Sequence, residues 1–430
     1  MAIAAVGPTT ASERIQALDI ARGMALFGIF MVNVQFMTMP LAAMYESSEG
    51  SRGALGDAAH YATRVLFESK SYPLFSMLFG MGLVLMYDRA KAAGRVFAPA
   101  YIRRLLLLLL VGLAHAFLLW YGDILVIYAC LGLIIMWLAP LRPKTMLTIA
   151  AVLVGVAAVW ASGLNYLFAV LGQGQEIASV KASTFAEFRE LLFAGKITEG
   201  PMSPAWAAGE TDAIGNGPFA NAVAMRAINW VSMSVFWLIF YAVVLHVPAM
   251  FLLGGAILRS GVVNDPNSPW IKRFILMGLL IGLPGSILSV WMSETYGAMS
   301  PMAAISSGVT HLFGPFVSLG YLGIAMWLAH SGALRWLVRA VAAAGRMALT
   351  NYLMQTILVA ALAQHWGLGW FGDVTRLEML WIVLAVYGLQ LIVSPIWLNA
   401  FGMGPFEYLW RCGTYLRLPG SKPKTQPAAS

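Results

Sequence analysis

The feature that most constrains this chain is a series of apolar stretches, each long enough to cross a lipid bilayer. The run "LLLLLLVGLAHAFLL" at 105–119 shows the pattern. A helix needs about 20 predominantly apolar residues to cross the hydrocarbon core, and backbone groups in lipid must be satisfied within the segment. We therefore predict an all-α, polytopic integral membrane helix bundle with about ten transmembrane helices. The predicted spans are 20–41, 71–88, 101–120, 123–140, 146–170, 231–258, 273–293, 306–330, 347–367 and 379–401.

Composition supports this class and excludes others. The chain is 60% hydrophobic and only 11% charged, whereas soluble domains are about 45–50% apolar and about 25% charged. Its net charge of +8 comes from Lys and Arg at the ends of apolar stretches, a pattern of topology determinants that argues against nucleic acid as a partner. The two cysteines, Cys130 and Cys412, have no evident partners, so we expect no disulfide framework and no metal.

The charges of the loops predict the orientation of the chain. The 88–104 connection carries five Lys or Arg residues against one Asp, whereas the long 171–230 loop is mixed in charge. By the positive-inside rule, both termini are cytoplasmic and the 171–230 loop is extracytoplasmic. We predict one transmembrane domain over 1–417 and a disordered cytoplasmic tail over 418–430. Within the long loop, "TFAEFRELLFAGKI" has apolar residues at helical spacing and predicts an interfacial helix.

Ionisable groups inside a span are costly and therefore mark candidate functional sites. His115 lies in the outer half of the third predicted span, and Asp123 follows eight residues later across a turn at Gly122. A carboxylate that orients a histidine fixes its tautomer and raises its basicity. A neutral histidine near pH 7 can then remove a proton from a hydroxyl or an amine. The alternative is that His115 only packs and bonds to a helix carbonyl.

Other polar side chains follow the remaining spans. Asp19 and Arg22 pair on one face of the first span, and Asn33 lies on that face about three turns later. Lys70 either binds an anionic group or extends to the membrane surface. We expect His246 either to contact substrate or to satisfy a carbonyl that Pro248 frees. The cytoplasmic arginines and a polar stripe on the ninth span complete the candidates: Arg104, Arg346, Asn351 and Gln355.

Five segments together carry a family resemblance. They are "ALDIARGMALFGIFMVN", "FESKSYPLFSMLFGMG", "RRLLLLLLVGLAHAFLLWYGDILVIYACLGL", "GRMALTNYLMQTIL" and "GPFEYLWRCGTYLR". In this order they resemble the YeiB-like family of bacterial membrane proteins. The Arg22-Gly23 pattern with a polar residue eleven positions after Arg22 also resembles the transmembrane acyltransferase superfamily, which includes the lysosomal heparan-glucosaminide acetyltransferase. The resemblance implies a multi-pass protein of the bacterial cytoplasmic (inner) membrane.

The acyltransferase resemblance implies acyl-CoA (acetyl-CoA) as co-substrate. In the glycan-decorating branch the polar residue is a catalytic histidine; here it is Asn33, as in the lysosomal enzyme, whose proposed catalytic histidine lies in the following loop. This sequence has His60 there, without a supporting motif. We instead predict His115 as the base and Asp123 as its orienter.

Two functions follow from these residues. In the first, an acyltransferase, Arg22, Arg104 and Arg346 with Asp19 hold acyl-CoA at the cytoplasmic face, and Asn33 stabilises the oxyanion. The acceptor is a hydroxyl or amine of a small molecule or glycan, extracytoplasmic or embedded in membrane lipid, with Lys70, His246, Asn351 and Gln355 as substrate contacts. The second is a transporter of a small molecule or lipid-linked substrate. A homodimer is a further expectation.

Overall fold

The computed structural model describes residues 15–44, 53–171, 180–197, 200–239, 241–297, 300–416 and 418. Every regular element in these ranges is a helix. Among them, seven helical segments are long and apolar enough to cross a membrane, and three further apolar helices have 10–17 residues. The chain is therefore a polytopic membrane protein, as predicted. Apart from Leu418, the predicted tail lies outside the described residues.

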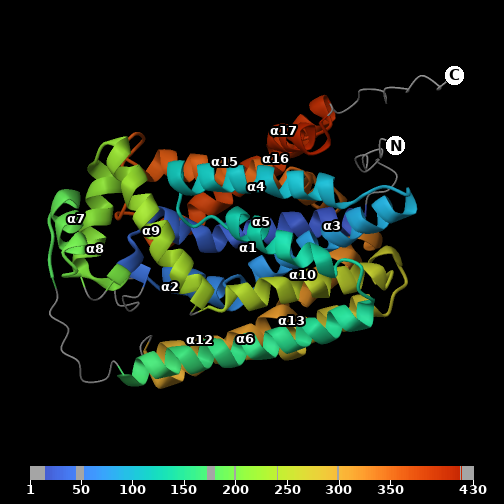
Figure 1. Ribbon diagram of the computed structural model, residues 1–430, viewed down its shortest axis with the longest axis horizontal. Helices are drawn as coiled ribbons and strands as arrows, with labels where there is room; N and C mark the ends of the chain where they lie inside the picture. The colour runs from blue at the N-terminus through green and yellow to red at the C-terminus, as the bar shows by residue number, and fades with distance from the viewer. Residues whose placement is uncertain are drawn as a thin grey trace.

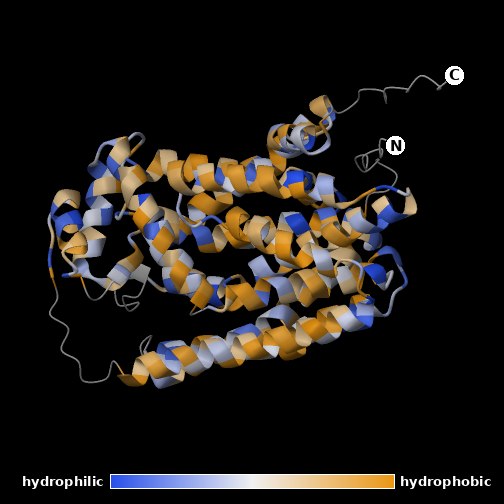
Figure 2. Cartoon of the chain, viewed as in Figure 1, coloured by the Kyte–Doolittle hydropathy of each residue, from blue (hydrophilic) through white to orange (hydrophobic). Residues whose placement is uncertain are grey.

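The long helices run roughly along one axis of the molecule, side by side (Figure 1). Apolar residues dominate their length, and hydrophilic residues gather at the two ends of the bundle (Figure 2). These helices are α1 (Gln16–Thr38), α3 (Ser71–Ala92), α4 (Ala98–Leu118), α5 (Leu125–Ile135), α6 (Pro143–Leu171), α9 (Phe219–Ile239), α10 (Val243–Arg259), α11 (Trp270–Met277), α12 (Leu283–Tyr296), α13 (Pro301–Ser331), α15 (Ala348–Ala363) and α16 (Arg376–Phe401). A π-helical turn at Gly278–Gly282 joins α11 to α12.

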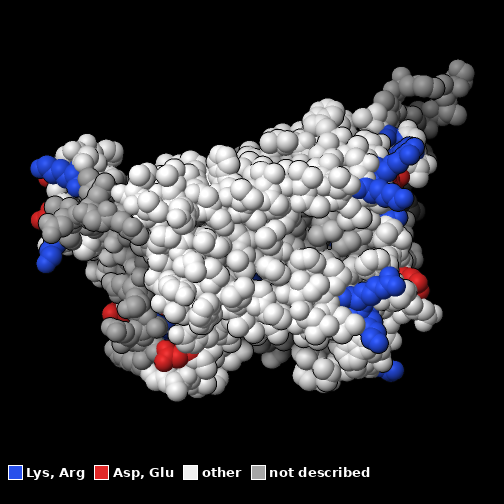
Figure 3. All heavy atoms as spheres, turned by 90° about the horizontal axis from the view of Figure 1, so that it is seen from below, with Lys and Arg blue, Asp and Glu red and all other residues white. Residues whose placement is uncertain are grey.

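Shorter helices cover the ends of the bundle. They are α2 (Ala54–Leu66), α7 (Phe185–Phe193), α8 (Pro204–Glu210), α14 (Arg335–Arg346) and α17 (Pro405–Tyr415). The loop between α3 and α4 lies at the end opposite α7 and α8 (Figure 1). Figure 3 shows most of the Lys and Arg of one face at the end that carries the loop between α3 and α4, separated from the other end by a wide band almost without charge. We call these the cytoplasmic and outer ends, following the positive-inside rule.

The single helix expected at 231–258 is wrong. The chain forms α9 and α10 instead, and Ala242 between them has a left-handed backbone (φ 45°). Hydropathy does not reveal the break because the stretch is apolar on both sides of it. The two helices together still make one passage, since α9 starts beside the outer helices and Arg259 at the end of α10 donates to Asp88 at 3.0 Å.

Side chains from other helices bond to two of the carbonyls at this break. Trp160 Nε1 of α6 donates to the Ile239 carbonyl at 2.7 Å, and His311 Nε2 of α13 lies 2.7 Å from the Tyr241 carbonyl. An unsatisfied carbonyl in lipid costs several kcal/mol. These two contacts therefore let a helix break persist at membrane depth.

Glycines allow α3 and α10 to pack with their backbones almost touching. A Cβ atom at Gly80 would overlap the carbonyl of Phe251, and one at Gly254 would overlap the carbonyl of Met77. Small residues at such crossings are the usual way in which membrane helices approach closely. The crossing of α3 and α10 lies within the largest apolar cluster of the described residues, which includes Met77 and Phe251.

The helix expected at the membrane surface within the long loop does form, as α7. Its residues Phe185 and Phe188 are buried, and the Phe188 ring meets Trp206 of α8 edge-on at 5.2 Å. The apolar face of α7 is therefore covered by this protein's own outer helices, and α7 and α8 form a small cap.

Candidate functional site

The candidate site begins at the outer end of α4, where the helix stops and the chain turns back. The Leu119 and Trp120 amides both bond to the His115 carbonyl, at 3.0 and 2.9 Å. Trp120 Nε1 and the Tyr121 hydroxyl donate to the Phe36 carbonyl of α1, at 3.0 and 3.4 Å. Two aromatic side chains thus fix the turn against α1.

This turn brings Asp123 back to His115. Nδ1 of His115 lies 3.1 Å from Oδ2 of Asp123. The other carboxylate oxygen, Oδ1, accepts the Val126 amide at 3.0 Å and so caps the first turn of α5. Both residues are buried, with 2% and 3% of their surface exposed. The sequence predicted this pairing from the eight-residue spacing and the turn.

A third group completes the arrangement. The Thr356 hydroxyl of α15 lies 2.9 Å from Nε2 of His115. In the neutral tautomer that donates its Nδ1 proton to Asp123, Nε2 carries the lone pair and can accept the Thr356 hydroxyl, whose other acceptor is the Tyr352 carbonyl at 3.4 Å. The order is carboxylate, imidazole, hydroxyl, which is the arrangement of groups in enzymes that activate a hydroxyl for acyl transfer. We call Asp123, His115 and Thr356 the relay.

The end of α4 has a further support that the sequence did not predict. Arg226 of α9 donates to the carbonyls of Phe117 and Leu118 at 3.2 and 3.0 Å and also bonds to Gln364. Gln364 Nε2 donates to the Leu119 carbonyl at 3.0 Å. A cation at a helix C-terminus is favourable, and here it holds the last turn that carries His115. In the sequence, Arg226 is visible only as a charge in a predicted loop, because the groups that meet here come from three separate segments of the chain.

Asn33 is not part of the relay. It lies half-buried on α1, one turn before Phe36, and no hydrogen bond among the described residues joins it to His115, Asp123 or Thr356. Trp120 and Tyr121, which bond to the Phe36 carbonyl, connect α1 with the relay. The centroid of the Trp120 ring lies 6.2 Å from that of the His115 ring.

The arginines predicted to bind a cofactor lie at the cytoplasmic end. Arg22 pairs with Asp19 at 2.7 Å, and Arg346 Nη2 donates to the Gly402 carbonyl at 3.3 Å. The Arg104 guanidinium lies 4.0 Å over the Trp410 ring of α17, within electrostatic reach of Arg22 and Arg411. Trp410 Nε1 also donates to the Arg104 carbonyl at 2.9 Å. Arg104 therefore holds α17 against α4.

Three of the four residues predicted to contact substrate bond to other groups of the protein. Lys70 Nζ donates to the Arg64 carbonyl at 2.7 Å, and burial lowers its pKa to about 8. Asn351 Nδ2 donates to the Ala344 carbonyl and to Ser394 Oγ, at 3.1 and 3.0 Å. Gln355 Nε2 donates to Gln390 at 2.9 Å. The contacts of Asn351 and Gln355 join α14, α15 and α16 and stabilise the bundle.

His246 was expected either to contact substrate or to satisfy a carbonyl freed by Pro248, and in the structure it contacts a tyrosine. Its Nδ1 lies 2.9 Å from the Tyr72 hydroxyl, so it does not satisfy a carbonyl freed by Pro248. Its ring meets the His311 ring edge-on at 5.0 Å. At this depth it is His311 that contacts a backbone carbonyl, that of Tyr241. The sequence did not point to His311, because the helix break that exposes this carbonyl is not visible in hydropathy.

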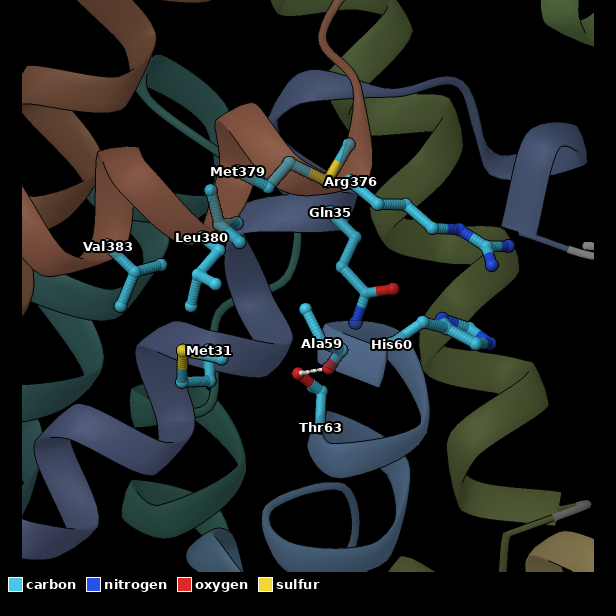
Figure 4. A pocket seen from close by; sticks show the side chains of 10 residues that line it. Met31, Gln35, Ala59, His60, Thr63, Arg376, Met379, Leu380 and Val383 are labelled. Carbon is cyan, nitrogen blue, oxygen red and sulfur yellow. Dashed lines mark hydrogen bonds between the residues drawn. The ribbon is translucent and has the colours of Figure 1, made fainter. Parts of the chain in front are cut away.

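A pocket opens at the outer end between α1, α2 and α16 (Figure 4). Met31, Met379 and Val383 lie along it, and they share an apolar cluster with Trp120 of the anchored turn. The pocket and the relay therefore border the same cluster from different sides.

Comparison with known proteins places the chain in a family. An uncharacterised protein of Bacillus subtilis (strain 168), YxaH, is 32% identical over 426 residues, which cover 95% of this chain and 96% of the relative. The chain belongs to the YeiB-like family. Another member, the uncharacterised YeiB of Escherichia coli (strain K12), is 29% identical over 93% of this chain and 96% of its own length.

Two further comparisons complete the picture of this YeiB-like protein. The model of a protein family of unknown function, DUF418, matches residues 257–417. That part of the chain runs from the last turn of α10 through α17, and it includes Thr356 but not His115. An uncharacterised 39.9 kDa protein of Bacillus acidopullulyticus is 28% identical over 95% of this chain and 96% of its own length. No solved structure matches.

The outer cap holds a buried carboxylate that predicts a dependence of stability on pH. Glu210 accepts the Leu41 amide at 2.9 Å and Asn229 Nδ2 at 2.8 Å, and burial raises its pKa from 4.5 to about 8. Between these values the folded chain keeps a proton that the unfolded chain releases, so stability falls as pH rises. We expect a loss of about 3 kcal/mol between pH 5.5 and 8, since one pKa unit is worth about 1.4 kcal/mol.

Thermal unfolding of the purified protein at pH 5.5, 7 and 8.5 measures this slope. Glu210→Gln should flatten it, because the group no longer titrates. Glu190→Gln, at an exposed position of α7, serves as the control and should keep the wild-type slope. An unchanged slope in Glu210→Gln would show that another group carries the dependence.

Proposed function

We propose that this protein is a membrane acyltransferase that moves an acyl group, such as acetyl, from cytoplasmic acyl-CoA to a hydroxyl or amine acceptor that is extracytoplasmic or embedded in the membrane. One observation carries the proposal, namely the relay of Asp123, His115 and Thr356. A buried imidazole with a carboxylate on one nitrogen and a hydroxyl on the other suits proton removal from an attacking hydroxyl.

In the proposed reaction, the acceptor takes the place that the Thr356 hydroxyl occupies on Nε2. His115 removes the acceptor proton while the acceptor oxygen or nitrogen attacks the thioester carbon. The carbon–sulfur bond then breaks, and the imidazolium returns the proton to the thiolate of CoA. Asp123 stabilises the imidazolium between these two steps. Asn33 is the proposed donor to the oxyanion, because it lies on the helix that anchors the relay turn.

The proposed donor site is the group of arginines at the cytoplasmic end. Arg22, Arg104 and Arg346 come from three helices, and arginine suits bidentate contacts to phosphate groups. Asp19 holds the Arg22 guanidinium in place at 2.7 Å. Acyl-CoA bound there through its phosphates directs its acyl chain toward the relay from the cytoplasmic side.

The direct test uses purified protein with acetyl-CoA labelled in the acetyl group and a membrane lipid and glycan extract. Label is expected in an acceptor fraction, together with one free CoA thiol per transferred group. Release of CoA without a labelled product would indicate hydrolysis, and no binding of acetyl-CoA to the wild type would contradict the proposal.

Arg22 provides a prediction for the donor site. Arg22→Gln is expected to weaken acetyl-CoA binding about tenfold or more, since a hydrogen bond to a charged group is worth about 1.5–3 kcal/mol. Equilibrium binding of labelled acetyl-CoA measures it. Arg142→Gln, at an exposed position in the loop before α6, removes the same charge from the same end and should leave the affinity near the wild-type value. Equal affinities in both variants would exclude Arg22 from the donor site.

Transport is the second candidate function, and the break between α9 and α10 is the observation that favours it. Interrupted helices with titratable groups beside the break, at membrane depth, line substrate paths in secondary transporters. His246 and His311 lie beside the break. Proteoliposomes with an internal pH dye test it: proton movement that depends on an added solute and is lost in His311→Gln supports transport.

A further inference from the structure

The outer pocket has two chemically different sides. In Figure 4, Met31, Leu380 and Val383 lie on one side, and Gln35, His60 and Arg376 project on the other. The residues come from three elements, α1, α2 and α16. The enclosed space is small, about 30 Å³, so a molecule with a polar head and a short apolar part fills it and extends beyond its mouth.

Among the described residues that line the pocket, Arg376 is the one charged side chain. Arg376 has Nη1 buried and without a hydrogen-bond partner among the described residues. A buried guanidinium N–H without an acceptor is costly, and an anion that accepts from it removes that cost.

Nearby carboxylates are occupied elsewhere. Glu68 pairs with Arg64 at 3.3 Å, and Arg64 also pairs with Glu294. Within α16, Glu378 accepts the Thr375 amide and hydroxyl, both at 2.7 Å, as part of a capping box. None of these carboxylates is hydrogen-bonded to Arg376 in the described part of the chain.

His60 supplies a neutral donor beside Arg376. Burial, followed by the charges of Arg376 and Arg64, lowers the pKa of His60 to about 4. At neutral pH the ring is therefore uncharged and offers one N–H and one lone pair. Gln35 adds an amide with two donors. The polar side is thus rich in donors and has one positive charge.

From this arrangement we propose that the pocket binds a carboxylate with a short aliphatic tail, which enters from the outer end. Arg376 and Gln35 bind the carboxylate, and Met31, Leu380 and Val383 pack against the tail. A planar carboxylate matches the fork of donors on a guanidinium. The site does not depend on the relay, so it stands or falls apart from the proposed acyl transfer.

Hexanoate is the probe. Full-length protein in detergent is titrated with sodium hexanoate, and binding is followed by saturation-transfer NMR and by the shift in unfolding temperature. Wild type is expected to show saturable binding, and Arg376→Gln to bind about tenfold to a hundredfold more weakly, as expected for loss of a charged hydrogen bond. Ala59→Leu, which narrows the pocket without touching a charge, should also weaken binding.

Controls separate the pocket from effects of salt and of the detergent micelle. Sodium chloride at equal ionic strength and hexan-1-ol, which lacks the carboxylate, should produce no saturable signal that differs between wild type and Arg376→Gln. Arg339→Gln, at an exposed position of α14, should bind hexanoate like the wild type. Equal hexanoate affinity in wild type and Arg376→Gln, or no saturable binding in wild type, overturns the proposal.

Discussion

Replacing His115 with alanine is expected to reduce acyl transfer about a thousandfold while acetyl-CoA still binds. The reason is that a positioned general base contributes about 10²- to 10⁴-fold to such a reaction, and no second imidazole contacts Asp123 or Thr356 among the described residues. The measurement is the single-turnover rate of label transfer with saturating acetyl-CoA, beside the affinity for acetyl-CoA at equilibrium.

Matched variants separate the chemistry from the fold. Asp123→Asn should also lower the rate strongly, because an amide no longer enforces the Nδ1–H tautomer, whereas Thr356→Val removes only the hydroxyl and keeps the shape of the side chain. His330→Ala, on α13, is the control and should retain the wild-type rate. If a His115→Ala protein with a wild-type unfolding temperature transferred label at the wild-type rate, His115 would not be the base.

Gly80→Ala is expected to be among the most destabilising single-methyl changes in the bundle. The added Cβ would overlap the Phe251 backbone carbonyl, and α10 would have to move away from α3. Overpacking costs about 1–3 kcal/mol and occasionally more. Because the atoms that the new Cβ would meet belong to the backbone and cannot rotate away, we expect the free energy of unfolding to fall by about 3 kcal/mol. The measurement is the unfolding temperature in detergent, together with the yield of monodisperse protein.

The same helix offers the control for this prediction. Gly82 lies two residues from Gly80, and a Cβ there would meet nothing within 4 Å. Gly82→Ala should therefore leave the unfolding temperature within a degree or two of wild type. Similar losses in both variants would mean that α3 tolerates no alanine for reasons other than the contact with α10.

The sequence predicts those features that depend on local composition. Hydropathy gives the class of protein and most spans, because a bilayer demands long apolar helices wherever the chain crosses it. The contact between His115 and Asp123 was also predictable, since only a short turn separates them. The break beside Ala242 was not, because the residues on both sides of it are equally apolar and its carbonyls are satisfied by Trp160 and His311 from distant helices.

The remaining part of the site depends on tertiary packing. Thr356 meets His115 only because α15 lies against α4, a contact between residues 241 positions apart. Arg226 reaches the end of α4 over 108 and 109 positions. No periodicity or motif within one segment contains such pairings. The polar stripe on α15 was visible, but Asn351 and Gln355 bond to neighbouring helices instead.

Asp123 uses one carboxylate oxygen for His115 and the other for the amide of Val126 in the first turn of α5. The carboxylate cannot swing away from the ring without uncapping that turn. Releasing the His115 ring therefore also breaks the first-turn hydrogen bond of α5, so the orientation of the ring and the start of that helix change together.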